Sequence, residues 1–418
     1  MNLSVNGDRL LARLEELASI GAITGSHGER GSARLALTDE DRDGRDLVVS
    51  WMHDLGLDVT VDVVGNVVAV MPGFGDLSPV MTGSHIDTVA TGGRFDGNLG
   101  VLAGLEVIES VLETGVQLER PLAVAFFTDE EGARFAPDML GSLVYVGGLA
   151  PEVAHDIRAI DGARLGDELE RIGYLGGAPC PGAVPRAFVE LHIEQGPVLE
   201  AEGYRLGAVT GVQGISWTRV DLVGQSNHAG TTPMAMRRDP SAAMMQIGAL
   251  LAEIVAEVGD PQVGTIGKID LHPNLVNVVP ARASFTIDVR HTDESILADV
   301  EHRVRAGIER IAAAHGVEAH LEALARFEPV IFDERVVELI EASAASHDVP
   351  CRRLPSGAGH DAQMLARRCP TAMIFTPSVR GVSHNPAEMT DADDLVLGCQ
   401  VLADVMLALT AHEGIGES

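Results

Sequence analysis

Two stretches of sequence decide the fold of this chain: VMTGSHIDTVATGGRFDGNLGVLAGLEV at 80–107 and LAVAFFTDEEGARF at 122–135. In both, an apolar run leads into a polar loop, as a strand leads into the loop of a βα unit. The loops carry a histidine and four acids that suit a divalent ion such as Zn²⁺, and the lack of a nearby cysteine argues against a closed structural zinc site. The sequence therefore predicts an open metal site that activates water; its residues are His85, Asp87, Asp96, Glu130 and Glu131.

The same alternation of strands and helices continues along the chain. Apolar, β-branched runs occur at 58–70, 79–84, 121–127 and 187–193, and 98–114 is a helical stretch. This order predicts an α/β fold whose mixed, mostly parallel sheet has helices on both faces. Catalytic residues are then expected at the carboxyl ends of the strands.

From about residue 207 the pattern changes. Two strand-like stretches lead into a helix at 238–257, then VGTIGKIDL and ARASFTIDVRH read as strands before a helix at 294–315. This order predicts a small α+β domain with an antiparallel sheet that has one face bare of helices. Histidine-containing motifs resume at 356–388, so we expect an inserted domain at 212–327 within a catalytic domain of 1–211 and 328–418.

Composition excludes several classes of function. The net charge of −31 disfavours nucleic acid and anionic membrane as partners, and the only lysine is Lys268. A GC-rich genome or an acidic surface adapted to salt would each explain this balance. The sequence has no run of eighteen apolar residues, so we expect no membrane span. The N-terminus has the pattern of an amphipathic helix and not of a signal peptide. The four scattered cysteines indicate free thiols, which favours a cytoplasmic location.

The first two motifs each allow a functional and a structural interpretation. In GSHIDT, His85 is placed to bind a metal while Asp87 orients the other ring nitrogen; the alternative is a surface loop. In GGRFDGNLGV, Asp96 is placed to bridge two metals; the alternative is a cap for the helix at 98–114.

Acidic residues cluster after a wholly apolar strand in FFTDEEGARF. A divalent cation would relieve their mutual repulsion, so we assign Glu131 as a ligand and Glu130 as the general base. The alternative is a solvated acidic loop. In ELHIEQGPVLE, His192 suits a second metal and Gln195 a polar substrate group, although a lone histidine there is more often structural.

The C-terminal motifs extend the set. His384 in FTPSVRGVSHNPAE completes the ligands, and SGAGHDA carries His360 and Asp361 at a helix start. The backbone amides of SGAGHDA are placed to hold a substrate carbonyl or carboxylate, or else form only a tight turn.

Three polar residues stand out within the inserted domain. His228 lies in a glycine-rich loop, and Asn277 and Arg290 flank a strand. Arg290 is suited to clamp a carboxylate with two hydrogen bonds. A loop histidine and a surface ion pair are the alternatives for His228 and Arg290.

Taken together, the motifs resemble the dinuclear zinc amidohydrolases of the peptidase M20 superfamily, and its hydantoinase/carbamoylase branch in particular. The resemblance spans nearly the whole chain and implies a zinc-exopeptidase-like catalytic domain with an inserted lid and dimerisation domain. The segment at 136–149 fits the branch less well. The motifs that carry the resemblance are GSHIDT, GGRFDG, TDEEGARF, ELHIEQG, HAGTTPM, SGAGHDA and GVSHNPAE.

The resemblance implies a role for each matching residue. Glu130 matches the general base, Asp87 the residue that supports His85, and His228 a catalytic and substrate-contacting position. The metal ligands implied are His85, Asp96, Glu131, His192 and His384, with Asp96 bridging. The further substrate contacts implied are Gln195, Asn277, Arg290 and the turn Gly357, Ala358, Gly359.

It also implies the chemistry. We expect two divalent ions per subunit, Zn²⁺ with Mn²⁺ or Co²⁺ as alternatives, in a homodimer formed through the inserted domain. The expected reaction is cleavage of the ureido C–N bond of a small anionic N-carbamoyl-L-amino acid or its β-analogue. Allantoate amidohydrolase is the first alternative, and an M20 peptidase or a non-catalytic metal-binding scaffold are lesser ones.

Overall fold

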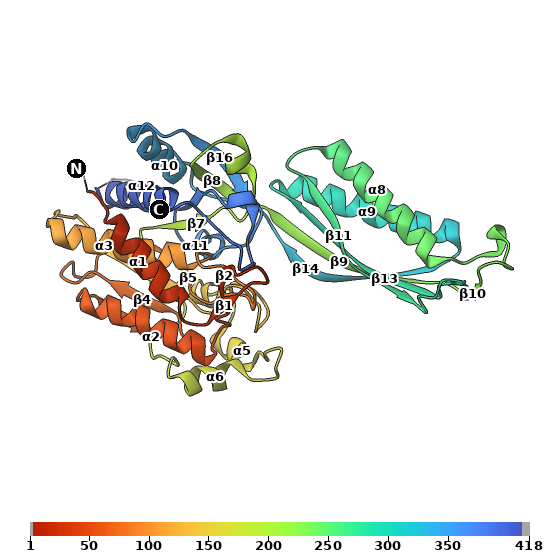
Figure 1. The fold of residues 1–418 in the computed structure, drawn as a ribbon, viewed down its shortest axis with the longest axis horizontal. Helices are drawn as coiled ribbons and strands as arrows, with labels where there is room; N and C mark the ends of the chain where they lie inside the picture. The colour runs from red at the N-terminus through yellow and green to blue at the C-terminus, as the bar shows by residue number, and fades with distance from the viewer. Residues whose placement is uncertain (1–2, 412–418) are drawn as a thin grey trace. The chain divides into compact units, whose positions relative to one another are not determined.

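The computed structural model describes residues 3–411 and divides into two compact units (Figure 1). The first unit is Met1–Gly211 with Ile331–Ser418, and the second is Val212–Val330. The role of the second unit as a lid and dimerisation domain stays a prediction.

A mixed sheet forms the centre of the first unit. Within residues 3–411 it has nine strands in the order β15-β8-β17-β7-β5-β6-β4-β3, with β16 paired to β8. The four central strands β17, β7, β5 and β6 are parallel, whereas β3, β4 and β8 pair antiparallel. The predicted mixed, mostly parallel sheet is confirmed. Its strands are β3 (Asp58–Val61), β4 (Val67–Val70), β5 (Val80–His85), β6 (Leu122–Phe127), β7 (Ala187–Ile193), β8 (Leu206–Val212), β15 (Val330–Ile331), β16 (Cys351–Ser356) and β17 (Thr371–Thr376).

Two groups of helices pack on this sheet. α3 contacts β5, β6 and β7 and also contacts α1 and α12, while α11 packs against β7 and α4 packs against α11 and β6. α3 is apolar on nearly all sides because it is enclosed, and it ends at Gly115 in the left-handed conformation. The helices are α1 (Gly7–Ala18), α2 (Asp39–Asp54), α3 (Asn98–Thr114), α4 (Leu140–Tyr145), α5 (Pro151–Asp156), α6 (Leu165–Ile172), α7 (Val198–Glu202), α10 (Glu334–Ser346), α11 (Asp361–Leu365) and α12 (Ala392–Ala411).

The structure differs from the strand prediction at two places in the first unit. The run at 58–70 is two strands, because a turn with Gly65 at φ 81° separates β3 from β4. The first strand-like stretch after residue 207 is β8, which pairs with β17 in the sheet of the first unit. A short hairpin of β1 (Ala22–Thr24) and β2 (Arg30–Ser32) lies apart from this sheet.

The second unit is an antiparallel sheet with two helices. Its four-stranded sheet has the order β11-β13-β9-β14, and α8 and α9 lie side by side against it (Figure 1). Alternate residues such as Phe285 and Ile287 of β13 enter the core beneath the helices. The helices are α8 (Pro240–Val258) and α9 (Glu294–His315); the strands are β9 (Gly214–Val223), β11 (Val263–His272), β13 (Arg282–His291) and β14 (Glu318–Phe327), with β10 (Asn227–His228) paired to β12 (Val278–Val279).

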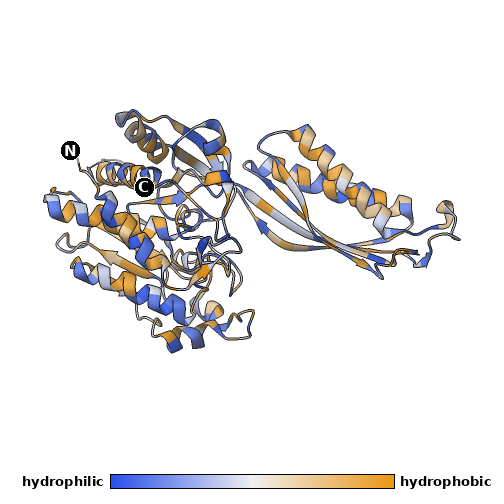
Figure 2. Cartoon of the chain, in the orientation of Figure 1, coloured by the Kyte–Doolittle hydropathy of each residue, from blue (hydrophilic) through white to orange (hydrophobic). Residues whose placement is uncertain are grey.

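Two helices of the described chain are long and apolar enough to cross a membrane by length and composition alone. They are α8 and α12, both rich in hydrophobic residues in Figure 2. α12 packs against α3, α10, β5, β7 and β17, and α8 packs against α9 and its sheet. Helices inside a protein core pass the same composition test, so these two are weak evidence for a membrane span.

Candidate active site

The parallel strands bring four sequence motifs to one edge of the sheet. His85 is the last residue of β5, and the acidic run 129–131 follows β6. His192 lies one residue before the end of β7, and the loop after β17 leads to His384. Because these strands run in one direction, their carboxyl ends meet, as the motif positions predicted.

The ligand candidates form two groups that share Asp96. His85, Asp96 and His192 offer ligand atoms within 4.8 Å of one another, and so do Asp96, Glu131 and His384. Asp96 Oδ1 lies 3.6 Å from His85 Nε2 and 3.2 Å from His192 Nε2. Asp96 Oδ2 lies 3.4 Å from His384 Nε2, which is 3.1 Å from Glu131 Oε2. Each oxygen of Asp96 therefore faces a different group.

These separations fit the ligand spacing of a small divalent ion. Two ligands that each lie about 2.0–2.2 Å from one tetrahedral ion are about 3.3–3.6 Å apart. The nitrogen and carboxylate donors also match what zinc takes in catalytic sites. The site thus fits two divalent ions bridged by one carboxylate.

The electrostatics of the site agree with this fit. Burial lowers the pKa of His192, but its hydrogen bond to Asp96 outweighs burial and raises the pKa to about 9. Hydrogen bonds to Asp96 and Glu131 raise the pKa of His384 to about 11. The carboxylates of Asp96 and Glu131 thus favour positive charge beside these two imidazoles, as a bound cation would supply.

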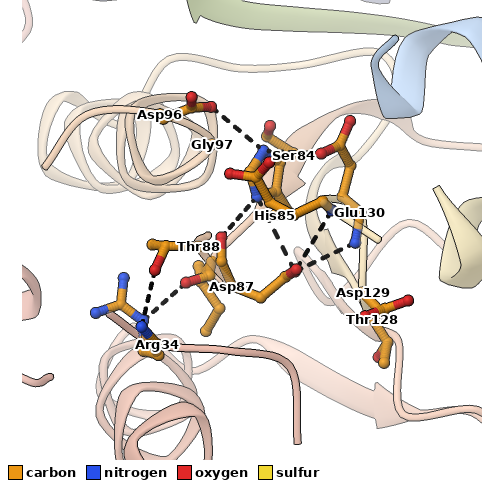
Figure 3. Close-up of polar contacts among 12 residues, drawn as sticks. Arg34, Ser84, His85, Asp87, Thr88, Asp96, Gly97, Thr128, Asp129 and Glu130 are labelled. Carbon is orange, nitrogen blue, oxygen red and sulfur yellow. Dashed lines mark hydrogen bonds and ion pairs between the residues drawn. The ribbon is translucent and has the colours of Figure 1, made fainter. Parts of the chain in front are cut away.

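Glu130 is set apart from the ligand groups by its surroundings. Burial, and then the Asp361 and Glu131 carboxylates, raise the pKa of Glu130 well above its usual range. Glu130 Oε2 lies 3.4 Å from His85 Nε2 at the wall of the site (Figure 3). A carboxyl group whose pKa is raised is a better proton acceptor than an ordinary carboxylate, as a general base requires.

The structure assigns Asp87 a different contact from the one predicted. The ring of His85 contacts the backbone carbonyl of Asp87 at 2.9 Å, whereas the Asp87 carboxylate lies 4.0 Å away. That carboxylate accepts the backbone N–H group of Glu130 at 3.3 Å (Figure 3). It also accepts the backbone N–H group of Glu131 at 3.4 Å. Asp87 therefore joins the β5 loop to the β6 loop, and its main chain orients the imidazole.

A cavity of about 110 Å³ opens onto both ligand groups. Gln195 donates from Nε2 to Asp96 Oδ2 at 2.9 Å, and its Oε1 is buried without a partner in the described chain. Larger cavities elsewhere contain neither ligand group. The residues that line this cavity are His85, Asp96, Glu130, Glu131, Asp138, His192, Gln195, Ala358, Gly359, His360 and His384.

The turn at 357–359 is held in place by its neighbours. The Ser356 hydroxyl accepts the Ala358 N–H at 3.1 Å and lies 2.9 Å from His360 Nε2. A Cβ on Gly359 would lie 2.8 Å from Met139 Cε, so this position is crowded. The predicted Gly357, Ala358 and Gly359 turn thus faces the cavity through Ala358 and Gly359.

Two acids that the motif analysis did not assign also support the site. Glu388 accepts the N–H groups of Phe95 at 2.9 Å and Asp96 at 3.2 Å. Glu190, in the middle of β7, accepts the Ser84 hydroxyl at 2.6 Å and the Ala362 N–H at 2.8 Å. Both lie inside motifs that were recognised, but their contacts depend on the folded arrangement.

The predicted substrate residues of the second unit lie at two places in that unit. His228 on β10 is next to Asn277, whose carbonyl accepts the Ala229 N–H at 2.9 Å. Arg290, on β13, pairs with Asp288 at 2.8 Å and lies over the Trp217 ring at 5.9 Å. The structure brings His228 and Asn277 together but not Arg290.

The whole arrangement agrees with a known family. The profile of peptidase family M20/M25/M40 matches residues 81–408. The chain belongs to this family. This confirms the predicted superfamily, and the comparisons below confirm the predicted branch.

The chain is similar to known proteins over nearly its whole length. It is 41% identical to an N-carbamoyl-L-amino-acid amidohydrolase of Rhizobium meliloti, with 97% of each chain covered. It is 38% identical to an allantoate amidohydrolase of Bacillus subtilis, over 95% of this chain and 96% of that one. A hydantoinase/carbamoylase family amidase from Burkholderia multivorans superposes with a TM-score of 0.94 at 44% identity, covering 98% and 99%. The M20 chain is an amidohydrolase of carbon–nitrogen bonds other than peptide bonds.

Proposed function

We propose that this M20 amidohydrolase hydrolyses an N-carbamoyl-L-amino acid, or its β-analogue, to the amino acid, ammonia and CO₂. One observation carries the proposal: Asp96 presents one carboxylate oxygen to each of two histidine–carboxylate groups at the base of a small cavity. That arrangement suits a two-metal hydrolase that acts on a small substrate.

Two divalent ions per subunit would be held by the two groups. His85 and His192 would hold one ion, Glu131 and His384 would hold the other, and Asp96 would contribute one oxygen to each. Zn²⁺ is the proposed metal, with Mn²⁺ or Co²⁺ as alternatives, because the donors are imidazole and carboxylate. When bound, the ions supply positive charge that acidifies water and polarises a carbonyl oxygen.

Glu130 is the proposed general base. It removes a proton from the attacking water, whose oxygen then forms a bond to the ureido carbonyl carbon. The ureido C–N bond breaks, and Glu130 passes the proton to the departing nitrogen. The remaining carbamate decomposes to ammonia and CO₂, so one water is consumed for each substrate.

Substrate contacts come from both units. In the cavity, the unpartnered Oε1 of Gln195 is an acceptor for a ureido N–H, and the turn at 357–359, of which Ala358 and Gly359 line the cavity, is a further proposed contact. The proposed carboxylate contacts are Arg290 and Asn277, and His228 is the proposed donor to the oxygen that gains charge.

The second unit supports a homodimer in which these contacts are divided. His228 follows the Val223 end of β9, while Arg290 pairs with Ile215 near the other end. Eight residues of strand span roughly 26 Å, too far for both side chains to touch one small substrate. We therefore propose that Arg290 serves the site of its own chain and that His228 and Asn277 serve the site of a second copy.

Allantoate is the alternative substrate. Relatives named allantoate amidohydrolases match this chain at 38% identity, close to the value for the N-carbamoyl-L-amino-acid enzymes. Allantoate also presents a ureido group beside a carboxylate, so the same site residues would serve it. We place the enzyme in the cytoplasm as part of the proposal, since its four cysteines are free.

An ammonia-release assay tests the proposal. The panel contains N-carbamoyl-α-amino acids, N-carbamoyl-β-alanine and allantoate, each after reconstitution with Zn²⁺, Mn²⁺ or Co²⁺. We expect the highest kcat/KM with an N-carbamoyl-L-α-amino acid. A higher kcat/KM for allantoate would select the alternative, and no ammonia from any substrate would reject both.

A further inference from the structure

Arg34 is a fully buried arginine that no motif in the sequence identified. It lies between β2 and α2, and its side chain is completely enclosed. Burial lowers the pKa of Arg34 to about 10, while Asp41 and Asp87 act in the opposite direction. The guanidinium is therefore charged at neutral pH. Within residues 3–411 it has no carboxylate at ion-pair distance, and its partners are neutral oxygens.

One set of these contacts fixes the loop that follows β5. Arg34 Nε donates to the carbonyl of Ile86 at 2.7 Å, next to His85. The Arg34 backbone N–H donates to Thr88 Oγ1 at 2.8 Å, and the Thr88 N–H donates back to the Arg34 carbonyl at 2.9 Å. Figure 3 shows Arg34 beneath this loop, beside Thr88 and Asp87.

A second contact fixes the loop that carries Asp96. Arg34 Nη2 donates to Asn98 Oδ1 at 2.9 Å. Asn98 in turn donates from Nδ2 to the Arg94 carbonyl at 3.2 Å and from its backbone N–H to the Asp96 carbonyl at 2.7 Å. One guanidinium thus joins the residue after His85 to the residues on both sides of Asp96.

The remaining hydrogen bonds of Arg34 fix the position of the guanidinium itself. Arg34 Nη1 donates to the carbonyls of Leu17 and Ile20 and to Ser32 Oγ, at 2.8–3.1 Å. These acceptors come from the end of α1 and from β2, so the N-terminal segment serves as the anchor. A planar guanidinium with five N–H donors can make these contacts at once, and a lysine ammonium cannot.

We propose that Arg34 is a positioning residue that sets the separation between His85 and Asp96 and thereby the affinity for the ion held by His85, Asp96 and His192. This role rests on the proposed two-metal centre. The ion held by Asp96, Glu131 and His384 depends on Arg34 less, because only one of its three ligands, Asp96, lies on a loop that Arg34 fixes, whereas the first ion has two such ligands, His85 and Asp96. A purely structural arginine would affect both ions alike.

Arg45 provides the matched control. It is also fully buried, and it donates to Asp41 at 2.8 Å, to the Gly65 carbonyl at 2.7 Å and to Thr128 Oγ1 at 3.2 Å. None of these acceptors is adjacent in sequence to a proposed ligand. Arg45→Lys should therefore destabilise the metal-free chain without weakening the affinity for one ion more than the affinity for the other.

The experiment measures Co²⁺ binding to the metal-free full-length chain by calorimetry and visible absorption, without substrate. His384→Ala leaves the ion at His85 and His192, and His192→Ala leaves the ion at Glu131 and His384. Arg34→Lys is added to each background. We expect Co²⁺ affinity to fall about 10- to 100-fold in the His384→Ala background and less than about threefold in the His192→Ala background.

Asn98→Ala, which removes only the link to the Asp96 loop, is the milder variant if Arg34→Lys does not fold. It should weaken the same ion about tenfold. Equal weakening in both backgrounds, no weakening in either, or the same selectivity from Arg45→Lys would overturn the positioning role. A wild-type chain that binds no Co²⁺ would instead overturn the metal centre on which the role rests.

Discussion

The two units of this amidohydrolase organise their functional residues in opposite ways. In the first unit, candidate ligands from five motifs meet within a few ångströms, because parallel strands end at one edge of a sheet. In the second unit, Arg290 lies on β13 of the four-stranded sheet, whereas His228 lies on β10, in a separate two-stranded sheet with β12. In the proposed function, the metal chemistry is thus local to one unit, whereas substrate recognition would be distributed and would need a second copy of the chain.

The largest effect is expected at Glu130, the proposed general base of the first unit. Replacing it distinguishes the role of the base from the role of the metal ligands. Glu130→Gln keeps the shape of the side chain but removes the group that takes the proton. We expect kcat to fall on the order of 10³-fold while two metal ions per chain remain. Metal analysis beside the ammonia assay measures both, and a variant with near wild-type kcat would overturn the assignment.

A complementation experiment tests the distributed arrangement of the second unit. His228→Ala and Arg290→Ala should each lower kcat/KM about 10²-fold, because each loses a contact to the substrate. Co-expressed together, they form mixed dimers in which one site has both residues intact. We expect recovery of about a quarter of wild-type activity in a random mixture. No recovery above the single variants would mean that both residues act within one chain.

Metal affinity should rise with pH. Contacts with Asp96 raise the pKa of His192 to about 9 despite burial, and those with Asp96 and Glu131 raise that of His384 to about 11. Both histidines therefore hold protons at neutral pH in the metal-free chain, and an ion must displace them. We expect affinity to increase about tenfold per pH unit for each displaced proton between pH 6.5 and 8.5. Competition with a chelator of known affinity measures this slope, and a flat profile would contradict it.

The smallest effect is expected at Asp87, which links the two loops of the first unit. Asp87→Asn retains one acceptor for the N–H groups of Glu130 and Glu131, so we expect kcat to fall about tenfold with both ions retained.

Thermal unfolding of the metal-free chain checks the contacts of Asp87 separately. Burial raises the pKa of Asp87 in the folded chain to about 7, above the unfolded value of about 3.9. Its contribution to stability is therefore full below about pH 4 and is lost as pH rises through 7. The advantage of wild type over Asp87→Asn should shrink over that range, and a growing advantage would count against this account.

Much of the first unit could be predicted from sequence because its signals are local. α3 spans Asn98–Thr114, the helical stretch that the sequence predicted, and the polar residues after each strand marked the candidate site. β14 was missed because EAHLEALARF has no strongly apolar face, and its residues are exposed or only half buried. β8 was grouped with the inserted domain because its pairing with β17 is a tertiary contact.

The supporting residues were harder to predict for the same reason. Arg34, Glu190 and Glu388 contact backbone groups far away in sequence, and spacing within a motif does not encode such contacts. Asp87 was recognised, but the sequence could not distinguish its carbonyl from its carboxylate as the partner of His85. Candidate metal ligands can be recognised from their residue types in the sequence. Residues that position the ligands can be recognised only from their contacts in the folded structure.

The most direct test of the account is the electron paramagnetic resonance spectrum of the chain loaded with Mn²⁺, together with its metal content. A carboxylate shared by two ions couples their spins, and Asp96 is the proposed bridge. We predict two Mn²⁺ per chain with a spin-coupled spectrum that Asp96→Ala abolishes. A single ion, or two ions without coupling in the wild-type protein, would contradict the two-metal centre.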